Sequence, residues 1–159
     1  MASPDLPRAG ARRTADVALR HLTPRGRARV HWPASCTESA LAALVVLFSA
    51  DDDLVDPIIA RLGAVVLTVP AAHAVDGHAA LSWAADHAAE LGVDATRIAV
   101  VGDRGAAALA ERVAELAADE GWPPLRHVAV IWPHDDPTAA LDGLARALAV
   151  PHPPRRSAR

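Results

Sequence analysis

RIAVVGDRGAAAL, residues 97–109, carries the strongest structural signal in the chain. The segment Arg97 to Val101 is an apolar run of the kind found in buried β-strands. Gly102 follows where the chain has to turn, and apolar residues then recur at helical spacing from Leu109 until Gly121, a residue that commonly ends helices. These residues therefore predict a buried strand, a sharp turn and a helix.

The same alternation extends to both sides of this segment. Further short apolar runs predict strands at Ala28–Trp32, Ala43–Phe48, Ala64–Val69 and His127–Trp132. Helical patterns lie between them, beginning at Asp53 or Asp56, at Asp76 (and ending at Gly92), and at Asp136. Because strands alternate with helices and are apolar on both faces, we expect an α/β fold, a three-layer sandwich with a mostly parallel sheet.

The length and composition favour one globular domain. The chain has 159 residues, of which 52% are hydrophobic and 22% charged. We expect a single domain over residues 14–150, between a disordered arm at 1–13 and a disordered basic tail at 151–159. No apolar run is long enough to cross a membrane, and the single cysteine, Cys36, fits a cytoplasmic location.

Charge is distributed unevenly, although the net charge is only −3. Residues 1–29 carry seven Arg and two Asp, whereas residues 30–150 carry six Arg and seventeen acidic residues. An acidic domain without a basic, aromatic-rich face is unlike a nucleic-acid-binding protein. The sequence therefore argues against nucleic acid as a partner.

The segment Trp83 to Asp103, WAADHAAELGVDATRIAVVGD, resembles the α/β-hydrolase esterases related to hormone-sensitive lipase. In that family a helix, a Gly-x-Asp-x-x-Arg-Ile loop and a strand lead into the nucleophile elbow, Gly-Asp-Ser-Ala-Gly-Gly. The similarity continues through Glu120–Leu125 and Ile131–Pro133, and it covers roughly residues 24–133. The resemblance implies an α/β-hydrolase fold.

The family's catalytic groups have no counterparts in this sequence. The elbow reads Gly102-Asp103-Arg104-Gly105, so Arg104 takes the position of the family's serine. Where the family has its His-Gly-Gly-Gly oxyanion loop, the chain has Ala50 followed by three aspartates. The chain also stops about one helix after Pro133, before the family's acidic and histidine triad members. The resemblance therefore implies a shortened, catalytically degenerate domain in which no residue is assigned a catalytic role.

Arg104 and the aspartates Asp51, Asp52 and Asp53 are expected at the same sheet edge, because the resemblance makes their two strands neighbours. Three arrangements are open. Arg104 forms an ion pair with one or more of the aspartates, it binds a small anion together with the helix N-terminus that follows it, or all four side chains lie in solvent.

Other chemistries are less well supported by the sequence. A receiver domain needs a lysine, and the chain has none. A dinucleotide site needs a glycine where Arg104 stands. Acids and histidines such as His73 and His134 follow several predicted strands, but without the spacing of a metal site. We therefore predict no cofactor and no metal. A residual ester hydrolase with an atypical nucleophile remains an alternative, with Cys36, Ser49 and Ser82 as candidates.

The resemblance also has a consequence for partners, because family members continue with two more strands beyond the one that matches His127–Trp132. That strand becomes a sheet edge in this chain, and an apolar edge favours association unless it is covered. We expect a homodimer formed through this edge or through the helix carrying Leu141 to Leu148. The expected role is binding or structural, in a homo-oligomer.

Overall fold

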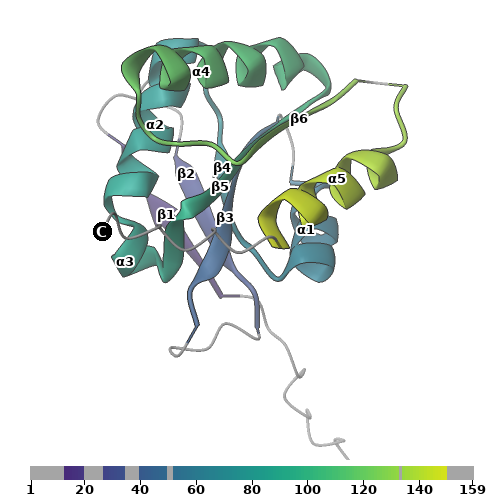
Figure 1. The fold of residues 1–159 in the computed structure, drawn as a ribbon, viewed down its shortest axis with the longest axis horizontal. Helices are drawn as coiled ribbons and strands as arrows, with labels where there is room; N and C mark the ends of the chain where they lie inside the picture. The colour runs from purple at the N-terminus through teal and green to yellow at the C-terminus, as the bar shows by residue number, and fades with distance from the viewer. Residues whose placement is uncertain (1–12, 20–26, 35–39, 50–51, 133, 150–159) are drawn as a thin grey trace, which may run out of the picture.

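One six-stranded sheet, in the order β1-β2-β4-β3-β5-β6, forms the centre of the molecule (Figure 1). The structure is a computed structural model and describes residues 13–19, 27–34, 40–49, 52–132 and 134–149. The strands are β1 (Arg13–Val17), β2 (Ala28–Trp32), β3 (Ala42–Phe48), β4 (Val65–Val69), β5 (Val93–Asp103) and β6 (His127–Ile131). Strands β4, β3, β5 and β6 are mutually parallel, and the two antiparallel pairs are β1 with β2 and β2 with β4.

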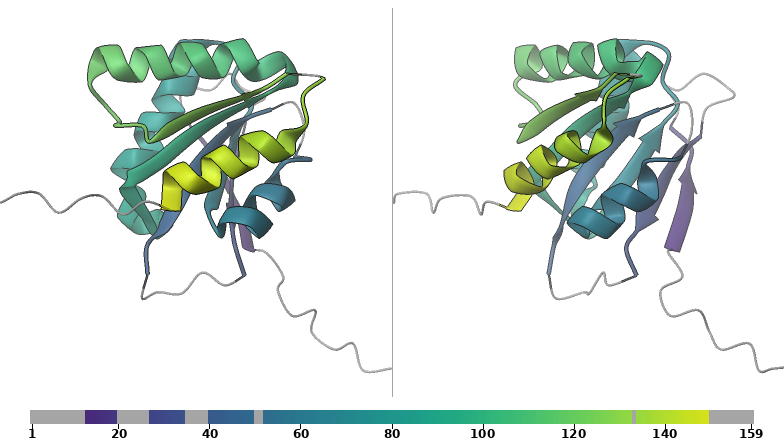
Figure 2. Two further views of the ribbon diagram at one scale, coloured as in Figure 1. Left: turned by 45° about the vertical axis from the view of Figure 1, so that its right-hand side comes forward. Right: turned by 90° about the vertical axis from the view of Figure 1, so that its right-hand side faces the viewer.

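Helices cover both faces of this sheet (Figure 2). They are α1 (Val55–Leu62), α2 (Ala74–Asp86), α3 (Ala88–Leu91), α4 (Ala107–Glu120) and α5 (Pro137–Ala149), with a short 3-10 turn η1 (Arg104–Ala106) before α4. Helices α1 and α5 pack on one face, and α2, α3 and α4 pack on the other. The predicted three-layer α/β sandwich with a mostly parallel sheet is confirmed.

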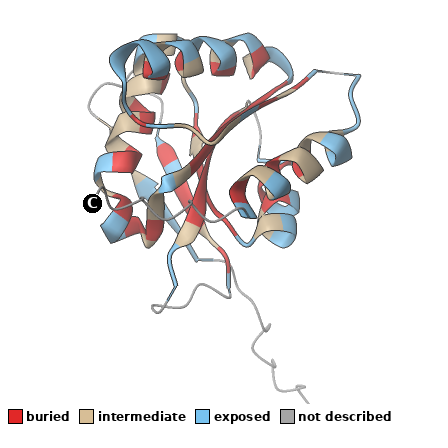
Figure 3. Cartoon of the chain, viewed as in Figure 1, coloured by how far each residue is buried: buried red, intermediate tan, exposed pale blue. Residues whose placement is uncertain are grey.

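The core is divided by the sheet into two apolar clusters, one under each helical layer. Strand β3 contributes to both, because Leu44, Val46 and Phe48 face α2 and α4 while Val45 and Leu47 face α1 and α5. These five side chains are fully buried, and the central strands of the sheet carry the buried colour over much of their length (Figure 3). Burial on both faces is the reason why this strand is apolar at consecutive positions.

Two of the predicted helix starts are wrong. The N-cap residue of α1 is Leu54 rather than Asp53 or Asp56, and it has a helical conformation and no side-chain capping hydrogen bond of its own. The chain enters α1 through a backbone turn instead, in which the Val55 N–H donates to the Asp52 carbonyl at 3.1 Å. Helix α2 begins at Ala74 rather than at Asp76, with the extended residue His73 as its N-cap.

The segment up to Gly92 forms two helices rather than one. The break lies at His87, whose backbone departs from helical geometry and whose ring stacks on Trp83 with centroids 4.7 Å apart. The prediction for Asp136 is confirmed, because its Oδ1 accepts a hydrogen bond from the Thr138 N–H at 2.9 Å at the start of α5. This bond holds the pKa of Asp136 below its ordinary value.

Strand β1 was not predicted, and β5 starts at Val93, well before the expected Arg97. Both additions contain polar residues, so neither has the continuous apolar pattern of the inner strands. The predicted disordered arm, apart from Arg13 in β1, and the basic tail lie outside the described residues. Cys36 does as well.

Helix α5 returns the chain to the amino ends of the parallel strands. There the Arg97 Nε donates to the Leu148 carbonyl at 2.9 Å, and Arg97 Nη1 donates to the Leu41 carbonyl at 3.5 Å. Arg97 thus ties the end of α5 to the segment that precedes β3. Within the described part of the chain, every helix is too short or too polar to span a membrane.

Candidate functional site

The elbow lies between β5 and α4, at the carboxyl edge of the sheet. Strand β5 ends at Asp103, and η1 then leads directly into α4. Arg104 has φ of 52°, and it is the only non-glycine residue with positive φ among those described. A sharp, strained turn from strand to helix is the backbone geometry that exposes the nucleophile in α/β-hydrolases. The turn here has that form and presents a guanidinium group.

Gly102 is required by the packing beneath this turn. A Cβ atom there would lie 2.5 Å from the Ala110 Cβ and 2.7 Å from the Ala106 carbonyl oxygen. No neighbouring atom would lie within 4 Å of a Cβ at Gly105. Strand and helix therefore approach so closely at Gly102 that any side chain would force them apart.

Asp103 is buried beside Ser49, a contact that the residue pattern did not predict. The parallel register pairs Phe48 with Gly102, so the next residues of the two strands are neighbours. The Ser49 hydroxyl donates to Asp103 Oδ2 at 3.3 Å. The two apolar runs that precede these residues place both at the same edge of the sheet, but the contact itself follows from the register of β3 and β5.

Arg104 and Asp103 form a close pair of opposite charges with very different exposure. The distance from Arg104 Nε to Asp103 Oδ1 is 4.0 Å, and the two side chains are 58% and 5% exposed. The guanidinium group is thus largely hydrated, while the carboxylate is held inside the protein.

A cleft of about 460 Å³ opens at the elbow. Its polar lining comes from Ser49, Asp103 and Arg104. Its apolar lining comes from Val69 at the end of β4, from Pro70 and Ala71 just after it, and from Leu109 on α4. A cavity of this size, mostly apolar with few polar groups, is typical of small-molecule sites.

The three aspartates of the predicted ion pair are only partly described. Asp51 lies outside the described residues, whereas Asp52 and Asp53 are exposed just before α1. The hydrogen bond from Arg29 to Asp16, at 2.7 Å, raises the pKa of the Arg29 guanidinium, and the charges of Asp16 and Asp52 add to the effect. Asp52 is thus close enough to β2 for its charge to act on Arg29. Pairing of the aspartates with Arg104 stays a prediction.

Other candidate residues lie away from the elbow. Ser82 is half-buried on α2 and does not line the cleft. His87 is also half-buried, and its Nδ1 hydrogen-bonds with the Trp83 carbonyl at 2.8 Å. Among the residues that the structure describes, no group of three or more His, Cys, Asp or Glu side chains is arranged to hold a metal ion.

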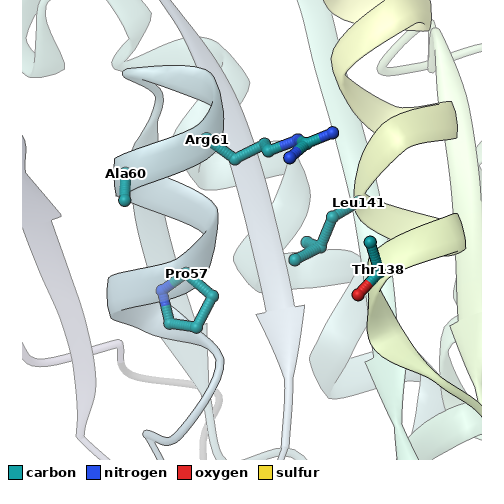
Figure 4. A pocket seen from close by; sticks show the side chains of 5 residues that line it. All are labelled: Pro57, Ala60, Arg61, Thr138 and Leu141. Atoms are coloured by element: carbon teal, nitrogen blue, oxygen red, sulfur yellow. The ribbon is translucent and has the colours of Figure 1, made fainter.

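A second cleft, of about 360 Å³, lies between α1 and α5 on the opposite face of the sheet (Figure 4). Pro57, Ala60 and Arg61 line it from α1, and Thr138 and Leu141 line it from α5. Arg61 also forms an ion pair with Asp142, which links the two helices. The charge of Arg61, the one charged residue among the described residues that line this cleft, is therefore used in holding the two helices together. For this reason we consider the cleft at the elbow the stronger candidate site.

The comparisons with known proteins agree with the geometry of the elbow. Residues 45–148 match the sequence profile of the α/β-hydrolase fold. The chain is 29% identical over 147 residues to Esterase LipI of Mycobacterium tuberculosis, an alignment that covers 77% of this chain and 46% of the relative. It is 50% identical over 50 residues to Carboxylesterase NlhH of the same species, covering 31% of this chain and 16% of that protein.

Solved structures give the same result. The thermostable carboxylesterase EstE1, cloned from a metagenomic library, matches with a TM-score of 0.62 at 28% identity over 74% of this chain and 46% of its own. The esterase of the archaeon Pyrobaculum calidifontis matches with a TM-score of 0.57 at 29% identity, over 73% of this chain and 43% of its own. The chain therefore spans less than half the length of these proteins.

Proposed function

The chain belongs to the α/β-hydrolase fold family, and we propose that it binds a small anion at the elbow instead of hydrolysing an ester there. The observation that carries this proposal is the identity of the residue on the strained turn, Arg104. A guanidinium group remains protonated in proteins and offers no nucleophile. It is, however, well suited to bind carboxylate or phosphate oxygens.

The surroundings of Arg104 support binding better than catalysis. The exposed aspartates Asp52 and Asp53 follow β3, where the family resemblance implies an oxyanion loop. Neither residue supplies the hydrogen-bond donors that an oxyanion hole needs, and neither lines the cleft beside Arg104, so they do not oppose an anion bound there. The 460 Å³ cleft beside Arg104 supplies space for a ligand.

Ester turnover tests the loss of hydrolysis. Purified protein is incubated with p-nitrophenyl butyrate beside an Arg104→Ala variant and a protein-free blank. We expect no release of p-nitrophenol above the blank from either protein. Release by the wild type would overturn the proposal and favour a residual esterase, and Cys36, Ser49 and Ser82 would then be replaced in turn.

Thermal unfolding tests the anion site. Acetate and inorganic phosphate are added at constant ionic strength to the wild type, Arg104→Gln and Arg112→Gln. Arg112 is a matched control, because it is paired with Glu115 on α4 and does not line the cleft. We expect at least one anion to raise the Tm of the wild type and of Arg112→Gln but not of Arg104→Gln. Equal shifts in all three proteins, or no shift at all, would contradict the proposal.

A homodimer formed through β6 is a second proposal, supported by a separate observation. Strand β6 pairs with β5 alone among the described strands, yet Val128 and the adjacent Trp132 are 36% and 50% exposed. Antiparallel pairing with a second copy would bury this edge around a two-fold axis. The helix that carries Leu141 to Leu148 turns those side chains into the core, which leaves the strand as the better candidate surface.

Sedimentation at micromolar concentration tests the dimer. We expect the mass of two chains for the wild type and of one chain for Val128→Lys, because a lysine on an edge strand opposes pairing. Ala15→Lys on β1, the other sheet edge, is the control and should keep the mass of the wild type. A wild-type mass of one chain would overturn this proposal.

A further inference from the structure

The lining of the elbow cleft restricts the chemistry of an anion that would fit it. Apart from the pair Asp103 and Arg104 and the Ser49 hydroxyl, the side chains that line the cleft are apolar. Of these, Val69 at the end of β4 is buried and Leu109 on α4 is half-buried. A ligand bound here therefore meets a cation at one end and aliphatic surface over the rest of its length.

The local charge favours one negative charge over two. The Asp103 carboxylate lies 4.0 Å from Arg104 Nε and is 5% exposed, so its charge is poorly screened by water. A monoanion at Arg104 gains a charge-assisted hydrogen bond. The Asp103 carboxylate repels any negative charge in the cleft, and this poorly screened repulsion doubles for a dianion, whereas the attraction to the largely hydrated guanidinium is more strongly screened. Phosphate and its esters, which carry close to two charges at neutral pH, are therefore disfavoured.

The backbone adds to the preference for an anion. Helix α4 begins at Ala107 next to the cleft, and neither its N-cap residue Ala106 nor the η1 N-cap residue Asp103 makes a side-chain capping hydrogen bond. The positive end of the α4 dipole therefore reinforces Arg104 without any competing capping side chain at these two positions.

We propose that the ligand of this cleft is a monocarboxylate with a short aliphatic tail. Its carboxylate pairs with Arg104, and its tail packs against Val69, Ala71 and Leu109. This inference rests on the proposed anion site and specifies its ligand. No covalent step is involved, because the carboxylate binds and leaves unchanged.

Titration calorimetry, with the Gly105 amide resonance as a site-specific readout, tests the inference. The probes are acetate, butyrate, hexanoate, hexanamide and inorganic phosphate at neutral pH. We expect saturable binding of hexanoate, with affinity that rises about two- to fourfold for each methylene added from acetate onward. Hexanamide, which lacks the charge, should bind at least about tenfold more weakly.

Two variants separate the contributions of charge and tail. Arg104→Gln should weaken hexanoate binding about tenfold or more, since it removes a charged hydrogen-bond donor. Leu109→Ala should retain acetate binding but flatten the dependence on chain length. Arg112→Gln should behave as the wild type does.

The outcomes distinguish a failure of the monocarboxylate inference from a failure of the proposed anion site. If phosphate binds as tightly as hexanoate and both depend on Arg104, the monocarboxylate is wrong while the anion site stands. The same conclusion follows if affinity does not change from acetate to hexanoate. If no anion binds, if hexanamide equals hexanoate, or if binding survives in Arg104→Gln, both the ligand class and the anion site are overturned.

Discussion

Beneath the elbow, Gly102 and the first turn of α4 are packed so closely that one added carbon atom would overlap its neighbours. On the surface above, by contrast, Arg104 is largely exposed and Gly105 has open space beside it. We call the closely packed region, Gly102 with Ala107, Ala110 and the half-buried Ala106, the frame, and the exposed pair Arg104 and Gly105 the rim. Close packing restricts which residues can occupy the frame, and this restriction does not depend on which side chain is presented at the rim. A hydrolase fold can therefore keep its elbow while the group presented there changes.

The largest expected effect comes from adding one methyl group to the frame. Gly102→Ala should lower the free energy of unfolding by about 3 kcal/mol, because the new Cβ would overlap Ala110 and the Ala106 carbonyl. Gly105→Ala is the matched rim variant and should stay within about 0.5 kcal/mol of the wild type. Urea denaturation measures both, and equal midpoints for the two variants would erase the distinction between frame and rim.

Ser49→Ala tests the junction between the two regions. The substitution removes the hydroxyl that donates to the buried Asp103 carboxylate, so we expect a loss of about 1–2 kcal/mol. Ser82→Ala, on α2 and away from the cleft, should cost less than about 0.5 kcal/mol. Should Ser49→Ala prove as stable as Ser82→Ala, Asp103 would not depend on this hydrogen bond.

The backbone strain at the rim is tested by a pair of substitutions at one position. Arg104→Gly and Arg104→Ala both remove the guanidinium group, but only glycine adopts φ of 52° without a Cβ penalty. We expect the glycine variant to be more stable than the alanine variant by about 1 kcal/mol. Chemical denaturation compares the two, and a more stable alanine variant would show that the turn is not strained.

The smallest effect is expected outside both regions, at the cap of α5. The Thr138 N–H lowers the pKa of Asp136 in the folded protein. The ionised Asp136 side chain therefore stabilises the fold fully above its unfolded-state pKa of about 4. This stabilisation is lost as the pH falls through the lower folded-state pKa. Asp136→Ala should lower the Tm slightly at pH 7, and the difference from the wild type should shrink below about pH 4. Asp119→Asn serves as the control, and a difference that grows on acidification would contradict the assignment.

The inner strands could be predicted from the sequence because burial on both faces leaves a continuous apolar run, as in β3. The edge strand β1 could not, because its residues Arg13–Val17 are mostly exposed and carry no such run. The division at His87 was also missed, since the apolar spacing of α2 and α3 continues across it. Aspartates such as Asp52 and Asp53 are favoured in turns as well as at helix N-caps, so residue type alone did not decide how the chain enters α1.

The candidate site was predictable in position but not in detail. Gly102 marks the turn because a close approach of strand and helix requires glycine. The positive φ of Arg104 has no signal in the residue itself, since arginine rarely adopts it. The contact between Ser49 and Asp103 depends on the exact register of β3 and β5, which residue patterns alone do not determine.

The hydrogen bond from Arg97 to the end of α5 indicates where a label or a surface linker could be attached to this protein. Because Arg97 holds the Leu148 carbonyl at the amino ends of the parallel strands, Ala149 lies at the opposite end of the sheet from Arg104. A fluorophore or surface linker coupled to the thiol of an Ala149→Cys variant would therefore project away from the elbow. Immobilised in that orientation, the protein would present the mouth of its cleft to the surrounding solution.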